Sequence, residues 1–258
     1  MRLMKRILSA AAALALSASL LVGCSSGTAS SVPVSASSAA ESTVSSVEET
    51  ASSAVDENEA AAAQLLNDLT GSYQELWPVI LADEYKQTWL DDCTALVGEE
   101  NAEAAFEKLS SMVTSDVYGE DAVEAYANGG GAYFCGFTNS LATLTFDGET
   151  STISGTDKDG NVLFSHAYHY IGMEPVRGLY EFESDDADSG EFTYFFLAPD
   201  TSAETYHIEF RYGSDADALS QYDAGDYAYW LASGISTDCD QTMIDNCIEL
   251  FCTENLAG

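Results

Sequence analysis

Basic residues are scarce in this chain. Lys and Arg number 8 against 43 Asp and Glu in 258 residues, which gives a formal net charge of −35 at pH 7. Because binding to a phosphate backbone depends on basic side chains, this composition excludes nucleic acid as a partner. The acidity itself is compatible with a well-solvated surface or with attraction of cations, and composition does not choose between the two.

Motifs that carry enzymatic chemistry are also missing. The sequence contains no GxSxG nucleophile motif, no phosphate-binding glycine loop and no pair of carboxylates at a spacing typical of a catalytic pair. We consider three candidate functions: a metal-binding protein, a binding module without metal, and a hydrolase. The missing motifs argue against the hydrolase. The sequence therefore predicts a protein that is not an enzyme.

Cysteine spacing offers no metal-binding motif, since none of the six cysteines belongs to a CxxC pair. Two of them, Cys247 and Cys252, fall at helical spacing among apolar residues. This pattern favours small buried hydrophobes or one disulfide over a thiolate zinc site. Apart from Cys24, whose role is described next, five cysteines are left with no pairing fixed by the sequence: Cys93, Cys135, Cys239, Cys247 and Cys252.

The N-terminus has the order of a secretory signal. Three basic residues precede an apolar run over residues 7–22, which is too short to be trusted as a membrane span. Leu21-Val22-Gly23-Cys24 resembles a bacterial lipobox, and this resemblance implies cleavage before Cys24 and acylation of its thiol. We expect residues 1–23 to be a lipoprotein signal peptide, and the mature protein to be extracytoplasmic and anchored to a bacterial membrane by lipid on Cys24.

Residues 24–59 are rich in Ser, Ala and Glu and contain no aromatic residue. Such a segment cannot bury enough apolar surface to offset the entropy lost on ordering, so we expect a disordered tether. The remaining chain, residues 60–258, is long enough for one folded domain.

Helices are expected at both ends of this domain. Between residues 59 and 127, apolar residues recur at spacings of three and four, first from Leu65 to Trp77, where Pro78 breaks or kinks the run, and then around 83–96 and 102–113. At the other end, Thr237 or Asp238 can cap a final helix. Its predicted buried stripe consists of Met243, Ile244, Cys247, Ile248 and Phe251.

Short aromatic and β-branched runs separated by turns follow Gly131. They predict about seven strands of an antiparallel meander, sandwich or barrel. The Asp-Gly pairs at 147–148 and 159–160 suit tight hairpin turns, because both residues tolerate positive φ. The predicted fold class is therefore mainly β, with N-terminal helices and a C-terminal helix.

Four segments, "SYQELWPVI", "RGLYEFE", "GEFTYFFLAPD" and "YHIEFRYGSD", occur in an order that resembles the ZinT (YodA) family. The resemblance runs from about Leu66 to Gly234. It implies a lipocalin-like (calycin) antiparallel β-barrel in an extracytoplasmic zinc-binding protein. It also implies that a divalent metal, most of all zinc, is captured for or delivered to an uptake transporter.

The resemblance also implies site residues. In that family three histidines hold zinc in the mouth of the barrel, and matching the motifs puts Asp200, Thr205 and His207 in their places. Zinc accepts imidazole nitrogen and carboxylate oxygen, so His207 and Asp200 are the expected ligands, with Thr205 and Glu209 as weaker candidates. Calcium is the alternative metal if backbone carbonyl oxygens act as additional ligands. The alternative function is a lipocalin-like binding or interaction module that has lost the metal site.

Strand alternation decides which way these side chains point. In a strand over residues 205–212, Thr205, His207, Glu209 and Arg211 share one face, opposite an apolar face. If the polar face lines the barrel interior, its side chains can form a ligand-binding site. If it faces water, His207 is a surface residue without a binding function. The other two histidines, His166 and His169, are expected on opposite faces of another strand, so that at most one points into the barrel.

Overall fold

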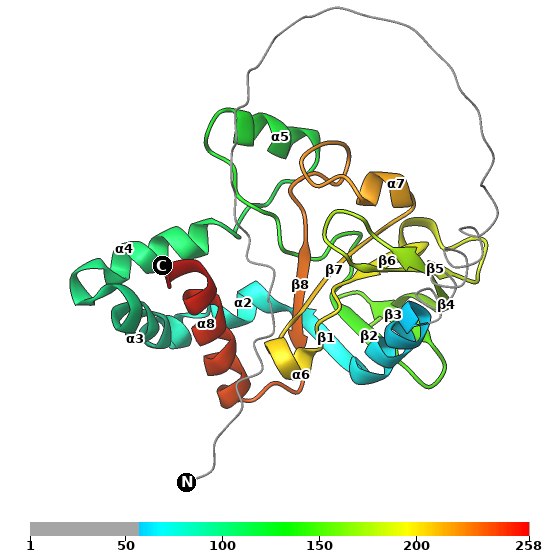
Figure 1. Ribbon diagram of the computed structural model, residues 1–258, viewed down its shortest axis with the longest axis horizontal. Helices are drawn as coiled ribbons and strands as arrows, with labels where there is room; N and C mark the ends of the chain where they lie inside the picture. Colours follow the sequence, from blue (N-terminus) through cyan, green and yellow to red (C-terminus); the bar gives the residue numbers. More distant parts are fainter. Residues whose placement is uncertain (1–56, 258) are drawn as a thin grey trace, which may run out of the picture. The chain divides into compact units, whose positions relative to one another are not determined.

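The computed structural model describes residues 57–257 (Figure 1). The predicted signal peptide (1–23), Cys24 and nearly all of the predicted tether (24–59) lie outside these residues. The first described element is a helix over residues 57–68, which includes the last three residues of the segment predicted as tether. Within residues 57–257, no helix is long and apolar enough to span a membrane.

Eight antiparallel strands close into a barrel in which each strand pairs with the next along the chain and β8 returns to β1. The predicted mainly β fold, a lipocalin-like barrel with flanking helices, is confirmed, with eight strands rather than about seven. The strands are β1 (Gly71–Glu75), β2 (Thr143–Asp147), β3 (Thr152–Thr156), β4 (Val162–Met173), β5 (Tyr180–Ser184), β6 (Tyr194–Leu197), β7 (Ile208–Gly213) and β8 (Ala232–Ser236).

Strands β1 and β8 were not predicted, whereas the first run after Gly131 (132–137) forms only isolated β-bridges at Phe134. Strand β1 lies where the apolar spacing predicted a continuing helix. The helical prediction for residues 71–75 is wrong, because Gly71 has a φ of 145° and turns the chain out of helical geometry. Tyr73 is buried, as its place in the apolar pattern from Leu65 to Trp77 predicted. It lies on a strand, however, where it is opposite Leu144 of β2 and Ser236 of β8. These two pairings close the barrel.

Three of the longer helices, α3, α4 and α8, gather beside the barrel in Figure 1 and pack on one another. The predicted cap of α8 was wrong, since Asp240 accepts the N–H of Met243 at 2.9 Å. The helical elements of the described chain that follow residues 57–68 are α2 (Leu76–Ile80), η1 (Asp83–Tyr85), α3 (Lys86–Val97), α4 (Glu99–Ser111), α5 (Glu120–Ala127), η2 (Gly190–Phe192), α6 (Ser202–Thr205), α7 (Ala216–Leu219) and α8 (Gln241–Leu256).

The protein has two apolar cores. The first fills the barrel with aromatic side chains, among them Phe182, Phe195, Phe210 and Tyr212, which are all at most 1% exposed. The second lies outside the barrel wall, where Ile235 of β8 packs with residues of α2, α3, α4 and α8. The interior is therefore a packed core, and the outer wall at β8 is covered by helices.

The two predicted hairpin turns are confirmed. Asp147, at the end of β2, accepts hydrogen bonds from the backbone N–H of Glu149 at 3.1 Å and from the hydroxyl of Thr150 at 2.9 Å. Asp157, between β3 and β4, accepts from the N–H of Asn161 at 2.8 Å. In both turns the aspartate satisfies backbone donors that the tight bend leaves free.

Candidate functional site

Strand β7 presents its apolar residues to the barrel interior. Ile208, Phe210 and Tyr212 belong to the interior core, so Glu209 and Arg211 point to the outside of the wall. The strand also begins at Ile208 rather than at residue 205, which leaves His207 just before it. The expectation that this polar face could line the interior is therefore wrong, and the polar residues lie on the outer wall.

His207 follows a sharp local turn. Thr205 ends α6, and Tyr206 adopts a left-handed conformation with φ of 66°. The Nδ1 atom of His207 lies 2.7 Å from the carbonyl oxygen of Thr205, so Nδ1–H donates to that oxygen and Nε2 is the atom that offers a lone pair when the ring is neutral. A backbone carbonyl orients metal-binding histidines in the same way.

The groups facing Nε2 come from β7 and α8. Oε1 of Glu209 lies 3.8 Å from Nε2, and the thiol of Cys247 on α8 contacts the same ring. The side chain of His207 is 19% exposed and that of Glu209 is 36% exposed. The pair is therefore partly shielded by the covering helix, but water and ions can reach it.

The charges of this cluster are coupled. Burial lowers the pKa of His207, but contacts with Cys247 and Glu209 outweigh burial and hold that pKa well above 6.5. Burial raises the pKa of Glu209, but the hydrogen bond and charge of His207, together with Arg177, bring it below 4.5. In the metal-free protein the two residues thus favour a charged pair.

Two further carboxylates lie in the electrostatic neighbourhood of the pair. Glu254, on the last turn of α8, has a raised pKa because of partial burial, which the charge of His207 opposes and the charges of Glu209 and Asp200 reinforce. Asp200 is exposed and lies in the connection between β6 and α6. The charges of three predicted residues, Asp200, His207 and Glu209, thus all act on Glu254, and this electrostatic cluster of four residues carries more negative than positive charge.

The donors fit a zinc ion in type. Two ligands of a tetrahedral zinc are about 3.4 Å apart, which is close to the 3.8 Å between His207 and Glu209. The hydroxyl of Thr205 is engaged with the carbonyl of His207 at 2.7 Å. Within residues 57–257, no group of three or more His, Cys, Asp and Glu side chains is already arranged to hold a metal ion. A third protein ligand therefore requires a side chain to rotate.

Arg211 does not compete for Glu209. Its guanidinium is fully buried and donates to the carbonyl oxygens of Leu219, Gln221 and Tyr227, in the segment that follows β7. It also lies over the ring of Tyr222, at 4.4 Å from the centroid. Arg211 thus anchors this segment to the barrel wall and leaves Glu209 to His207.

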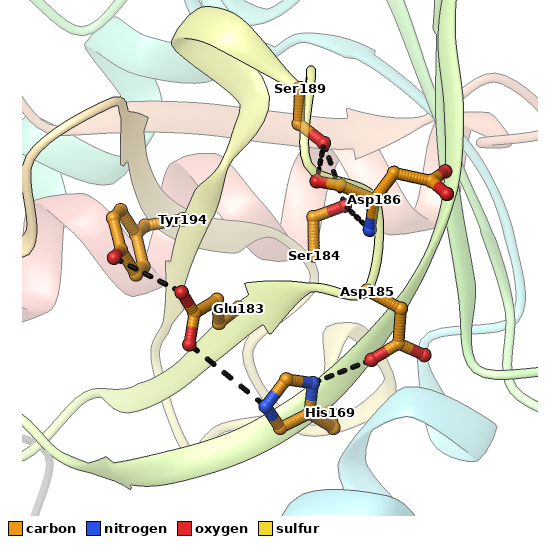
Figure 2. A network of polar contacts seen from close by, with 7 residues as sticks. All are labelled: His169, Glu183, Ser184, Asp185, Asp186, Ser189 and Tyr194. Atoms are coloured by element: carbon orange, nitrogen blue, oxygen red, sulfur yellow. Dashed lines mark hydrogen bonds and ion pairs between the residues drawn. The ribbon is translucent and has the colours of Figure 1, made fainter.

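The other two histidines lie on β4, three strands away from β7 in the barrel. His166 shares the inward side of Phe164 and contacts Asp186 at 2.6 Å, whereas His169 points outward, so the predicted opposite orientation is confirmed. Figure 2 shows the ring of His169 between two carboxylates, with Nδ1 2.7 Å from Asp185 and Nε2 4.0 Å from Glu183. Carboxylates at opposite nitrogens cannot join His169 around one metal ion.

Sequence reasoning missed two members of the cluster, Cys247 and Glu254. Both belong to α8, more than 35 positions after His207 in the chain. Cys247 was assigned to the buried stripe of the helix, and its exposed fraction of 2% confirms that assignment. No local signal marks either residue as a neighbour of β7, because only the docking of α8 brings them together.

The fold and this cluster define a helix-flanked antiparallel β-barrel with a candidate cation site on its outer wall. No family model matches the sequence, and a search of curated proteins finds no match. Among solved structures, the chain is similar to the Zn(II)-bound ZinT-like domain of Streptococcus pneumoniae AdcA, with 14% identity and a TM-score of 0.46 over 72% of this chain and 89% of that domain. Zn(II)-bound AdcA from the same organism is similar over 70% of this chain and 34% of its own, with 13% identity and a TM-score of 0.43. At these values no residue-by-residue correspondence follows.

Proposed function

We propose that the protein binds a divalent cation, zinc, between β7 and α8, with Nε2 of His207 and a carboxylate oxygen of Glu209 as the primary ligands. The observation that carries this proposal is the orientation of His207, whose Nδ1 is fixed by the carbonyl of Thr205 while Nε2 faces Glu209 at 3.8 Å. Glu254, Asp200 or a water molecule completes the coordination.

The ligand types favour zinc over calcium. Calcium takes six to eight oxygen ligands, whereas this cluster offers an imidazole nitrogen and a neighbouring thiol beside its carboxylates. The surplus of negative charge around His207 also favours a bound cation over an empty cluster. The partly exposed position suits a cargo ion that is taken up and released.

The wider role proposed is that of an extracytoplasmic lipoprotein, anchored through Cys24, that captures the metal or delivers it to an uptake transporter. This part rests on the N-terminal sequence and on the ZinT-like motifs. The alternative is a lipocalin-like binding or interaction module that has lost the metal site. Binding of a small ligand in the barrel lumen is disfavoured because aromatic side chains fill it.

Thermal unfolding of the chelator-treated protein with and without zinc tests the proposal. A ligand that binds only the native state at 100 times its dissociation constant stabilises by about 2.7 kcal/mol, so zinc should raise the melting temperature by about 5–10 °C. Calcium at the same concentration should raise it far less. An unchanged melting temperature with zinc contradicts metal binding.

A further inference from the structure

Two cysteines that are far apart in sequence meet in the helical layer outside the barrel. Cys93 on α3 and Cys252 on α8 are separated by 159 positions, and their Sγ atoms lie 3.9 Å apart. Both side chains have 0% exposure. The two thiols are thus in direct contact and shielded from solvent.

The packing around the pair fixes how the two helices face each other. Trp89 lies one turn before Cys93, and its ring centroid is 6.0 Å from that of Phe251, the neighbour of Cys252. This contact holds α3 against α8 at the level of the two sulfurs. A disulfide has an S–S distance of about 2.05 Å, so the sulfurs must approach by about 2 Å, which side-chain rotation can supply.

The remaining described cysteines have other surroundings. Cys135 is buried beside Ser233, Cys247 contacts His207, and Cys239 is only partly buried. In the part of the chain that the structure describes, no other two cysteine sulfurs lie within hydrogen-bonding distance of each other. The sequence leaves the pairing of these five cysteines open, and the structure brings only Cys93 and Cys252 together among the described residues.

We propose that Cys93 and Cys252 form a disulfide bond that ties the C-terminal helix to α3. The two thiols lose their protons and two electrons, and one S–S bond forms between them. A disulfide-bearing oxidant, such as a thiol oxidoreductase or oxidised glutathione, accepts the electrons, and its own S–S bond breaks to give two thiols. The bond crosslinks α8 to a helix that precedes the second strand of the barrel.

The bond forms before α8 is fully docked. Thiolates, not thiols, attack disulfides, and burial raises the pKa of both Cys93 and Cys252 in the folded protein. Exchange inside the closed core is therefore slow, while in the unfolded chain both thiols are accessible. The same burial protects the finished disulfide from reductants.

Peptide mapping of the full-length protein, exported by its bacterial host and purified without reductant, tests the proposal. The protein is denatured, alkylated without reduction and digested. The expected result is a crosslinked peptide pair containing Cys93 and Cys252, with alkyl groups on Cys135, Cys239 and Cys247. Alkylation of both Cys93 and Cys252, or a link from either to a different cysteine, overturns the proposal.

Melting temperatures give a second test that does not involve zinc. The Cys239→Ala variant keeps the Cys93–Cys252 pair. When this variant is reduced in its unfolded state and refolded with reductant present, its melting temperature should fall by about 10 °C, because the loop that the disulfide closes is long. In Cys252→Ala or Cys93→Ala, reductant should have no effect. Equal responses in the Cys239 and Cys252 variants overturn the disulfide. A chelator leaves the reductant response unchanged, so the result is independent of the proposed metal site.

Discussion

The Nε2 atom of His207 lies 3.8 Å from Oε1 of Glu209, while Nδ1 of the same ring lies 2.7 Å from the carbonyl oxygen of Thr205. The backbone therefore orients the imidazole, and its free nitrogen is directed to a carboxylate. A metal ion that displaces the proton on Nε2 meets an imidazole ring already oriented by its Nδ1 hydrogen bond.

Replacing His207 with Ala should remove the rise in melting temperature that zinc causes, because the substitution deletes the nitrogen ligand. We expect the affinity for zinc to fall at least 100-fold in isothermal titration calorimetry. His169→Ala is the matched control, since His169 also lies between carboxylates but at opposite nitrogens. If the two variants lose zinc binding equally, the site is not at His207.

Glu254→Gln tests the contribution of α8. This change keeps the size of the side chain but removes a charge that repels those of Glu209 and Asp200, so the affinity for zinc should fall by about tenfold. The metal-free protein should not lose stability, because a repulsive charge is removed. Glu249→Gln, on an exposed position of the same helix, should leave calorimetric zinc affinity unchanged. An unaltered affinity in Glu254→Gln removes this residue from the site.

The pair of His207 and Glu209 should give metal-free stability a defined pH dependence. Because the pKa of His207 is raised above 6.5, its contribution is complete below pH 6.5 and is lost as pH rises through the folded pKa. Because the pKa of Glu209 is lowered below 4.5, its contribution is complete above pH 4.5 and is lost as pH falls through the folded pKa. The stability difference between wild type and Glu209→Gln in urea titrations should therefore be largest between pH 4.5 and 6.5. A difference that does not change up to pH 9 contradicts the ion pair.

The same titration implies a pH dependence of binding. Zinc takes the neutral imidazole, so a proton leaves His207 on binding in the range where the residue is charged. Zinc affinity should consequently rise with pH through neutrality in wild type.

Asp240→Ala should destabilise the protein by about 1 kcal/mol, because the N–H of Met243 loses its capping acceptor at the start of α8. Asp238→Ala is the matched control, since this nearby aspartate was one of the two residues predicted to cap the helix and does not accept that bond. Chemical denaturation of both variants measures the difference. A larger loss in Asp238→Ala would show that the helix begins earlier than the structure has it.

Much of the fold could be predicted because its signals are local. The Asp-Gly pairs at 147–148 and 159–160 mark hairpin turns, and the alternation of Ile208, Phe210 and Tyr212 identifies an apolar strand face. The strand at Gly71–Glu75 could not be found in this way, because its apolar residues continue a helical spacing. Its strand character comes from pairing with β2 and β8, which lie about 70 and 160 positions later.

The candidate site was predicted only in part for the same reason. His207 and Glu209 lie two positions apart at the start of β7, so a sequence pattern can group them. Cys247 and Glu254 join them through the docking of α8 on the barrel wall. Periodicity does indicate that β7 has a polar face, but it does not indicate whether that face lines the lumen or lies under a helix.

The pairing of β1 with β8 has a kinetic consequence. Tyr73 meets Ser236 only when nearly the whole domain is available, so the first and last strands impose a long loop closure on folding. Until that moment β1 and β7 each present an unpaired strand edge, which can recruit other chains. A nascent or truncated chain that stops before residue 232 should therefore aggregate rather than fold partially.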